Sequence, residues 1–230
     1  MAKKKNISKR ASLKQRRQAE RARAARNKKL RWAGIATLVV LTIGAVAYWR
    51  SASAEPVNNP AEVMAANTIG PTDAPVQIVE FGDLGCPACR AWHNAGIREQ
   101  ILAKYGDRIS ITFRHFPVIT PQSPQAAEAS QCAAEQGAFW EYHDYIYEQT
   151  PQGALSVTDL QSYAAAIGLD TNAFNNCMSS GKYREYVARD QQAAFSNGAR
   201  GTPSFYINGQ AVYYPGFEDL AVAIDGVLSQ

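Results

Sequence analysis

The pattern of apolar and polar residues along the chain changes its period several times, and each change predicts a new element. An apolar, β-branched run from Val76 to Phe81 is typical of a buried strand. A glycine-bearing turn follows, and a helical spacing of apolar residues then continues to Tyr105. Residues 108–116 alternate between apolar and polar side chains. They therefore predict a second strand.

Five helices are predicted after a loop that contains three prolines. Their helical patterns cover residues 125–136, 139–148, 158–167, 171–179 and 182–195. Ser156 and Asp170 stand where helix N-caps are favoured. Gly137, Gly168 and Gly181 stand where helices end.

The last part of the chain combines a hairpin with a helix. Asn208-Gly209 separates two short runs of strand-forming residues, which is the strongest short-range signal of a β-hairpin. A final helix is predicted over residues 217–228. The resulting order is strand, helix, strand, several helices, two strands and a helix, so we expect an α/β fold.

Charge divides the chain into two unlike parts. Residues 1–32 hold 14 Lys or Arg and one acidic residue, whereas residues 51–230 hold 9 Lys or Arg and 19 Asp or Glu. The formal net charge of +4 therefore combines a strongly basic arm with an acidic body of net charge −10. A basic arm can bind nucleic acid. The apolar stretch that follows favours a role of the arm in setting membrane orientation instead, and we expect no nucleic-acid partner.

Residues 33–49 carry no charge and are bordered by Trp32 and Trp49, as in a short membrane span with aromatic residues at its interfaces. Because the positive charge precedes the span, the N-terminus should be cytoplasmic and the chain after Arg50 extracytoplasmic. A signal peptide cleaved after Ala54 is the competing interpretation. The long basic arm and the long apolar run favour an uncleaved, single-pass anchor, and both interpretations export the body.

We therefore expect four segments, of which the last is one domain with a sizeable core. They are a basic cytoplasmic arm at 1–32, a transmembrane anchor at 33–49, a linker at 50–68 and the domain at 69–230. Residues 61–66 of the linker have the composition of a short helix. Export makes disulfide bonds chemically reasonable in the domain.

The candidate chemistry lies at Cys86-Pro87-Ala88-Cys89, where the first predicted helix begins. Unpaired N–H groups and the helix dipole stabilise an anion at a helix N-terminus, so Cys86 is the expected nucleophile. Cys89 lies one turn further and is close enough to form a disulfide with Cys86. A zinc half-site and an inert structural disulfide are the alternatives.

With these residues identified, the sequence from about residue 69 onward resembles the DsbA-like branch of the thioredoxin-fold family. The resemblance is carried by DAPV at 73–76, EF at 80–81, CPAC at 86–89, GAFWEYHD at 137–144 and GTPSF at 201–205. It implies a thioredoxin-like fold with a helical domain inserted at about residues 122–197. It also implies thiol-disulfide exchange with exported proteins, without a cofactor or a metal.

The resemblance assigns roles to individual residues. Cys86 would exchange with the substrate sulfur, and Cys89 would resolve the mixed disulfide. Pro203 would be in the cis form beside the cysteines, with the backbone of Thr202 pairing with an extended substrate segment. Glu80 matches a buried acid of the family that assists proton transfer, and an ordinary strand carboxylate is the alternative.

Strongly oxidising members of that family carry His before the second cysteine, where this chain has Ala88. A weaker thiolate would make the Cys86–Cys89 disulfide a milder oxidant. Cys132 and Cys177 lie singly in helical segments, and in an exported domain we expect a structural disulfide between them, with two free thiols as the alternative.

The function expected from the sequence is disulfide formation in exported proteins. By family likeness, a DsbB-like or VKOR-like membrane quinone reductase would reoxidise the site. An isomerase or reductase is the alternative of the same class, although the short linker leaves no room for the dimerisation domain of DsbC-like isomerases. A metal carrier that uses Cys86, Cys89 and His93 is the alternative of a different class.

Overall fold

The computed structural model describes residues 65–213 and 216–230. The predicted basic arm, the predicted membrane anchor and most of the predicted linker lie outside these residues. Of the short helix predicted at residues 61–66, only Ala65 and Ala66 are described, and both are helical. Within the part of the chain that the structure describes, none of the helices is both long and apolar enough to cross a bilayer.

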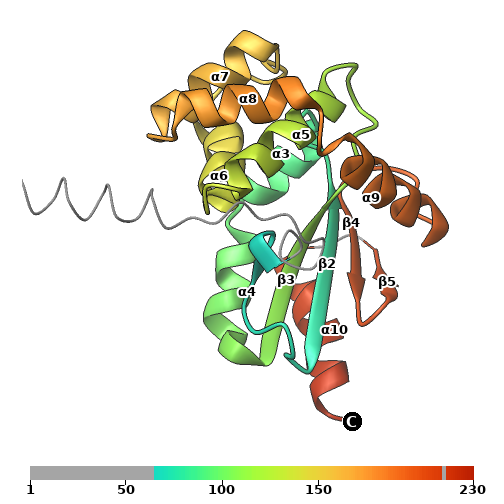
Figure 1. The fold of residues 1–230 in the computed structure, drawn as a ribbon. Coiled ribbons are helices and arrows are strands. Elements are labelled where there is room, and N and C mark those ends of the chain that lie inside the picture. The colour runs from blue at the N-terminus through green and yellow to red at the C-terminus, as the bar shows by residue number, and fades with distance from the viewer. Residues whose placement is uncertain (1–64, 214–215) are drawn as a thin grey trace, which may run out of the picture. The chain divides into compact units, whose positions relative to one another are not determined.

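A mixed five-stranded sheet with the order β1-β3-β2-β4-β5 forms the centre of the fold (Figure 1). Its strands are β1 (Thr68–Ile69), β2 (Val76–Gly82), β3 (Ile109–His115), β4 (Ser204–Ile207) and β5 (Gln210–Val212). β2 runs parallel to β3 and antiparallel to β4, which places β2 in the middle of the sheet. β1, which lies where the predicted linker meets the predicted domain, pairs with β3.

Eight α-helices surround this sheet among the described residues. They are α3 (Pro87–Asn94), α4 (Ile97–Tyr105), α5 (Ser123–Ala134), α6 (Phe139–Gln149), α7 (Val157–Ala166), α8 (Thr171–Ser180), α9 (Arg184–Ser196) and α10 (Phe217–Leu228). A short 3₁₀ helix, η1 (Gly106–Arg108), leads into β3. The prediction of one helix from the cysteines to Tyr105 is wrong, because Gly96 adopts a left-handed conformation with φ of 65° and separates α3 from α4.

The predicted helix caps are present. The Ser156 side chain accepts a hydrogen bond from the Asp159 backbone N–H, and the Asp159 carboxylate accepts one from the Ser156 N–H, so α7 begins with a capping box. The Asp170 carboxylate accepts two backbone N–H groups at the start of α8. Gly181 ends α8 with φ of 63°, a conformation that glycine adopts without steric cost.

The Asn-Gly hairpin also folds as its sequence predicts. Asn208 and Gly209 have φ of 46° and 80°, and the flanking residues Ile207 and Gln210 are cross-strand partners. Positive φ at both central residues matches the turn whose twist suits a two-residue hairpin. The hairpin places β5 at the edge of the sheet, beside β4.

Helices cover both faces of the sheet. On one face α4 and α10 pack against β2, β3 and β4 through residues such as Ile78, Ile101 and Ile224. A hydrogen bond of 3.1 Å from the Tyr105 hydroxyl to the Ala221 carbonyl joins these two helices. α9 lies on the other face of the sheet (Figure 1), and its residue Ala194 shares a buried cluster with Phe81 of β2.

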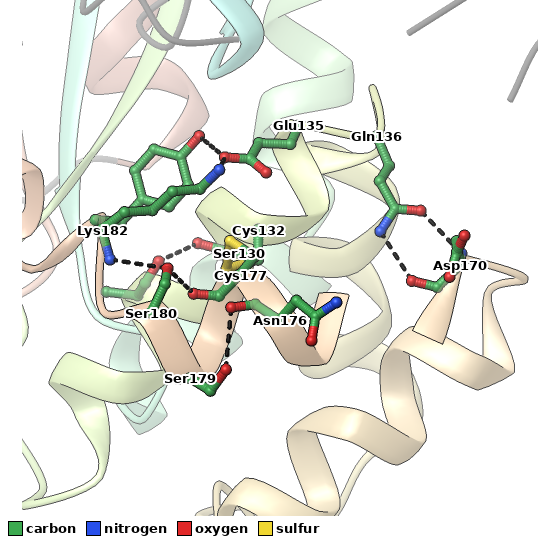
Figure 2. The surroundings of a disulfide bond; sticks show 12 residues. Ser130, Cys132, Glu135, Gln136, Asp170, Asn176, Cys177, Ser179, Ser180 and Lys182 are labelled. Carbon is green, nitrogen blue, oxygen red and sulfur yellow. Dashed lines mark hydrogen bonds and ion pairs between the residues drawn. A yellow bond between two sulfur atoms is a disulfide. The ribbon is translucent and has the colours of Figure 1, made fainter. Parts of the chain in front are cut away.

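Helices α5 to α8 form the inserted layer above the end of the sheet where β2 stops (Figure 1). Their common core contains Tyr142, Leu160 and Phe174. A disulfide of Cys132 with Cys177 joins α5 to α8, and their Cα atoms are 5.7 Å apart (Figure 2). The resemblance implied an insertion at about residues 122–197, which includes α9, and α9 packs against the sheet through Ala194.

Candidate active site

The two remaining cysteines begin α3, directly after the central strand. β2 ends at Gly82, and a hydrogen bond of 2.9 Å from the Cys86 N–H to the Asp83 carbonyl closes the turn that follows. Cys86 is the N-cap of α3, and Pro87 occupies the first turn, where a missing N–H costs nothing. The sulfur of Cys86 therefore faces the unpaired N–H groups of a helix N-terminus.

The surroundings of the two sulfurs make their acidities diverge. Both cysteines are free thiols, so the structure corresponds to the reduced site. The pKa of Cys86 is lowered to about 6, mainly by a hydrogen bond from the Cys89 thiol, with further help from the backbone N–H groups of Cys89 and Ala88. Cys89 is fully buried, and desolvation raises its pKa well above the usual value. At neutral pH Cys86 is thus ionised while Cys89 keeps its proton.

A loop from the distant end of the chain completes the surroundings of Cys86. The Thr202–Pro203 peptide bond is cis, and the Thr202 carbonyl oxygen lies 3.3 Å from the Cys86 sulfur. When Cys86 is protonated, this carbonyl accepts a hydrogen bond from the thiol. The backbone beside Pro203 is therefore within contact distance of anything that bonds to Cys86.

Glu80 lies in β2 among apolar neighbours. Its register partners are Phe113 of β3 and Phe205 of β4, and the residue is 2% exposed. Desolvation raises the pKa of Glu80 to about 8 even though the nearby Arg98 guanidinium acts to lower it. The charge of Glu80 in turn contributes to the raised pKa of Cys89. Glu80 is therefore a buried acid that holds a proton near the cysteine pair at neutral pH.

Asp83 fixes the turn before Cys86, although the sequence pattern did not single it out. Its buried carboxylate accepts a backbone N–H from Gly85 at 2.7 Å. The other oxygen accepts the N–H groups of Val118 and Ile119, each at 2.8 Å. Hydrogen bonds to an ionised acceptor are stronger than neutral ones. Asp83 thus binds the cysteine turn to the loop after β3.

A second cluster of polar residues joins α4 to α6, and the sequence pattern did not predict it either. Arg98 of α4 makes two hydrogen bonds of 2.9 and 2.8 Å with the Asp144 carboxylate of α6. Asp144 also accepts from His143 at 2.8 Å, with the tautomer that protonates Nδ1. Arg98 and His143 hold the pKa of Asp144 far below its usual range. The spacing of Arg98 and Asp144 in the sequence gives no local signal of this contact.

His93 belongs to this polar cluster and not to the cysteine pair. Its Nε2 lies 3.1 Å from Glu148, and its Nδ1 lies 3.7 Å from Asp144. Among the described residues, the group whose ligand atoms come close enough to surround a metal ion is His93, His143 and Asp144, without either cysteine. Because Asp144 already accepts three hydrogen bonds from Arg98 and His143, its oxygens are occupied by donors. The arrangement gives no support to a metal carrier built on Cys86, Cys89 and His93.

The structure brings the expected site residues together in two places. Cys86, Cys89, Glu80, Thr202 and Pro203 gather where β2 and α3 meet the loop before β4. Cys132 and Cys177 are bonded to each other inside the helical insertion, and both are buried. Around that disulfide, Glu135 contacts Lys182 and the Tyr183 hydroxyl (Figure 2).

Comparison with known proteins agrees with this fold. A family model described as Thioredoxin matches residues 63–226. The curated protein named Na(+)/H(+) antiporter NhaA 3 of Salinispora tropica is 37% identical over 158 residues, which cover 67% of this chain and 24% of that protein. The chain thus spans about a quarter of the length of the curated relatives that it matches.

Solved structures give the same result. The thioredoxin-like oxidoreductase from Silicibacter pomeroyi superposes with a TM-score of 0.63 and 25% identity, over 71% of this chain and 92% of that one. The alpha-DsbA1 protein of Wolbachia pipientis superposes with a TM-score of 0.62 and 24% identity, over 71% of this chain and 90% of that one. The fold is therefore thioredoxin-like, with DsbA proteins among its structural neighbours.

Proposed function

The chain belongs to the thioredoxin family, and from this membership and its cysteine geometry we propose that it is an extracytoplasmic thiol-disulfide oxidoreductase that forms disulfides in exported proteins. The observation that carries the proposal is the difference in pKa between the two thiols. Cys86, with a pKa of about 6, is held at a helix N-terminus beside cis-Pro203, while burial keeps the neighbouring Cys89 protonated. A structural disulfide or a metal site has no need of this difference.

The geometry supports the following exchange. A substrate thiolate attacks the Cys86 sulfur of the oxidised pair, which forms a mixed disulfide and breaks the Cys86–Cys89 bond. Glu80, which is protonated at neutral pH, supplies a proton to the departing Cys89 thiolate. The second substrate thiolate then attacks the substrate sulfur that is bonded to Cys86. Cys86 leaves as a thiolate, so two electrons have passed from the substrate to the site.

The stability of the Cys86 thiolate determines how strongly the pair oxidises. A leaving group of low pKa departs faster and favours the reduced site. Because Ala88 offers only its backbone N–H to the sulfur, where strongly oxidising relatives carry His, we propose a moderate oxidant. The reduction potential against glutathione separates an oxidase from a reductase. A value near that of thioredoxin, about −270 mV, would favour a reductase.

We propose that the protein works at the outer face of the cell membrane, anchored by residues 33–49 with the basic arm in the cytoplasm. The proposal rests on the sequence: 14 basic residues precede an uncharged stretch, and the body that follows is acidic. A reporter enzyme that is active only outside the cytoplasm should work when fused after Gln230. Purified protein that is soluble and begins at Glu55 would refute the anchor and support cleavage.

The proposed partners follow from the resemblance to DsbA-like proteins. We propose exported cysteine-containing proteins as substrates and a DsbB-like or VKOR-like membrane quinone reductase as the acceptor of the two electrons. Deleting such a reductase in the host cell should leave Cys86 and Cys89 reduced, as measured by alkylation and mass mapping. A site that remains oxidised after the deletion would refute this choice of partner.

Trapping of the mixed disulfide tests the proposed exchange directly. In Cys89→Ala the Cys86 thiolate can still attack a substrate disulfide, which is the reverse of the second step, but no Cys89 thiol remains to displace the bound substrate. Substrates should therefore accumulate on Cys86 as high-mass species on nonreducing gels. Reductant should release them, and Cys86→Ala should form none. Pro203→Thr in the wild-type background should slow their release, because it alters the backbone that contacts the sulfur. The absence of Cys86-linked species in an oxidising compartment would overturn the proposal.

A further inference from the structure

A hollow of about 470 Å³ opens beside the cis-proline loop. It is bounded by residues 197–203, which follow α9, and by strands β4 and β5 of the hairpin. Tyr206 is one of its lining residues, and the Tyr206 hydroxyl donates a hydrogen bond of 3.0 Å to the Asn197 carbonyl, which joins β4 to the segment after α9. Thr202 and Pro203 also line the hollow, and the Thr202 carbonyl oxygen lies 3.3 Å from the Cys86 sulfur.

The side chain of Arg200 is the single charged group among the residues that line this hollow. It is exposed, and it has no ion pair or hydrogen bond to any residue of the described ranges. Every other Lys or Arg side chain among the described residues contacts a carboxylate or a backbone carbonyl. These are Arg90, Arg98, Lys104, Arg108, Arg114, Lys182, Arg184 and Arg189.

The remaining wall of the hollow suits an extended polypeptide. β5 is an edge strand of the sheet, so one row of its backbone groups is unpaired among the described residues. Tyr213, at the end of this wall, is 78% exposed. Aromatic and arginine side chains are the types enriched at protein interfaces. The hollow thus combines a strand edge, an exposed ring and a cation that has no partner among the described residues.

We infer that this hollow is a substrate subsite in which Arg200 binds an acidic side chain close to the reacting cysteine of the polypeptide. The inference rests on the proposed function and narrows its substrate class to cysteine-containing segments with a nearby Asp or Glu. The residues after position 50 carry a net charge of −10, so acidic segments are repelled by the body as a whole. Arg200 is a local positive charge, so it should favour the alignment in which the acidic side chain of the substrate lies beside Arg200.

The position of Arg200 sets the spacing. It precedes Thr202 by two residues, and the Thr202 carbonyl is 3.3 Å from the Cys86 sulfur. An extended chain advances about 3.3 Å per residue. The acidic residue should therefore lie within about three residues of the substrate cysteine.

Peptides that differ at one position test this subsite. Each peptide contains one cysteine and carries Asp, Asn or Lys at a position within three residues on either side of it. The oxidised protein is mixed with each reduced peptide, and the rate of mixed-disulfide formation is measured by acid quenching, alkylation and mass spectrometry. At the best position the wild type should favour Asp over Lys by about fivefold at low salt, and about 1 M salt should remove most of the preference.

Charge variants assign the preference to Arg200. Arg200→Gln should abolish the preference for Asp, and Arg200→Glu should reverse it. Arg184→Gln is the matched control, because Arg184 is 79% exposed at the start of α9 and does not line the hollow. This control should keep the wild-type preference.

Reduction by dithiothreitol, a small uncharged dithiol, separates the two proposals. A wild type that cannot be reduced by dithiothreitol would refute the proposed function itself. Normal reduction by dithiothreitol, combined with an Asp preference that is absent in the wild type or unchanged in Arg200→Gln, would overturn the subsite alone.

Discussion

Replacing Cys89 by Ala in the reduced protein should raise the pKa of Cys86. In the wild type this pKa is about 6, and the hydrogen bond from the Cys89 thiol contributes most to the lowering. The backbone N–H groups of Ala88 and of residue 89 remain in the variant, so part of the lowering should persist. Cys89→Ser keeps a hydroxyl donor at the same place. The pKa of Cys86 should therefore rise in the order wild type, Cys89→Ser, Cys89→Ala.

The magnitude follows from the two pKa values. At pH 7 a thiol of pKa 6 is about 90% thiolate, while one of the reference pKa, 9.0, is about 1% ionised. The low-pKa thiolate is also about twentyfold less nucleophilic for a Brønsted slope of about 0.45. Cys86 should thus be alkylated about fourfold faster than an ordinary thiol at pH 7, but about twentyfold more slowly near pH 10.

The assay is iodoacetamide alkylation of the reduced protein from about pH 4 to about pH 10, with the modified residue identified by peptide mass mapping. In the wild type, the Cys86 rate should have its midpoint near pH 6 and level off above it. Because the pKa is lower in the folded chain than in the unfolded one, ionisation should also stabilise the reduced fold as the pH rises from about 6 to about 9. A wild-type midpoint near pH 8, or the same midpoint in all three proteins, would refute this reasoning.

Four further predictions concern Glu80, Asp83 and the disulfide between Cys132 and Cys177. Glu80→Gln should raise the free energy of unfolding by about 3 kcal/mol at pH 7 and leave it nearly unchanged at pH 4. The reason is that a carboxyl whose pKa is raised from 4.5 to about 8 on folding destabilises the fold as the pH rises through that range. Urea unfolding at both pH values measures this difference, and an equal effect of the substitution at both would contradict it. Asp83→Asn should lower the free energy of unfolding by about 3 kcal/mol, since three backbone N–H groups lose a carboxylate acceptor. A decrease below about 1 kcal/mol in urea unfolding would argue against the role of Asp83 in holding the cysteine turn. Replacing both Cys132 and Cys177 by Ala should lower the free energy of unfolding by about 4 kcal/mol, because the disulfide closes a loop with a sequence separation of 45. In the wild type, mild reductant should expose the active pair to alkylation before these two, and equal labelling of all four would contradict it.

The features that could be predicted from the sequence are those decided by neighbouring residues. The capping box at Ser156 and the hairpin at Asn208-Gly209 each depend on a few consecutive residues, so their sequence signals were sufficient. The placement of Cys86 at a helix N-terminus is local in the same sense. The break at Gly96 shows the limit, because a glycine inside a helical pattern is tolerated in many helices and ends only some of them.

The features that could not be predicted are contacts between distant segments. The Asp83 carboxylate meets the N–H groups of Val118 and Ile119, 35 and 36 residues away. Arg98 meets Asp144 across 46 residues. No periodicity in the sequence records which side chains a fold brings together over such separations. The place of Pro203 beside Cys86 was reached through family resemblance alone, and the 116 residues from Cys86 to Thr202 explain why.

The helical insertion takes part in the redox site and does more than enlarge the domain. The buried core of the insertion includes both Cys86 and Cys89. The Tyr147 hydroxyl of α6 donates to the Asp83 carbonyl at 3.0 Å, and Arg90 of α3 donates to the Tyr147 carbonyl at 2.8 Å. These bonds hold α6 over the cysteine turn and exclude water from Cys89. Since desolvation is the main cause of the raised pKa of Cys89, the insertion maintains the difference in acidity on which directional exchange depends.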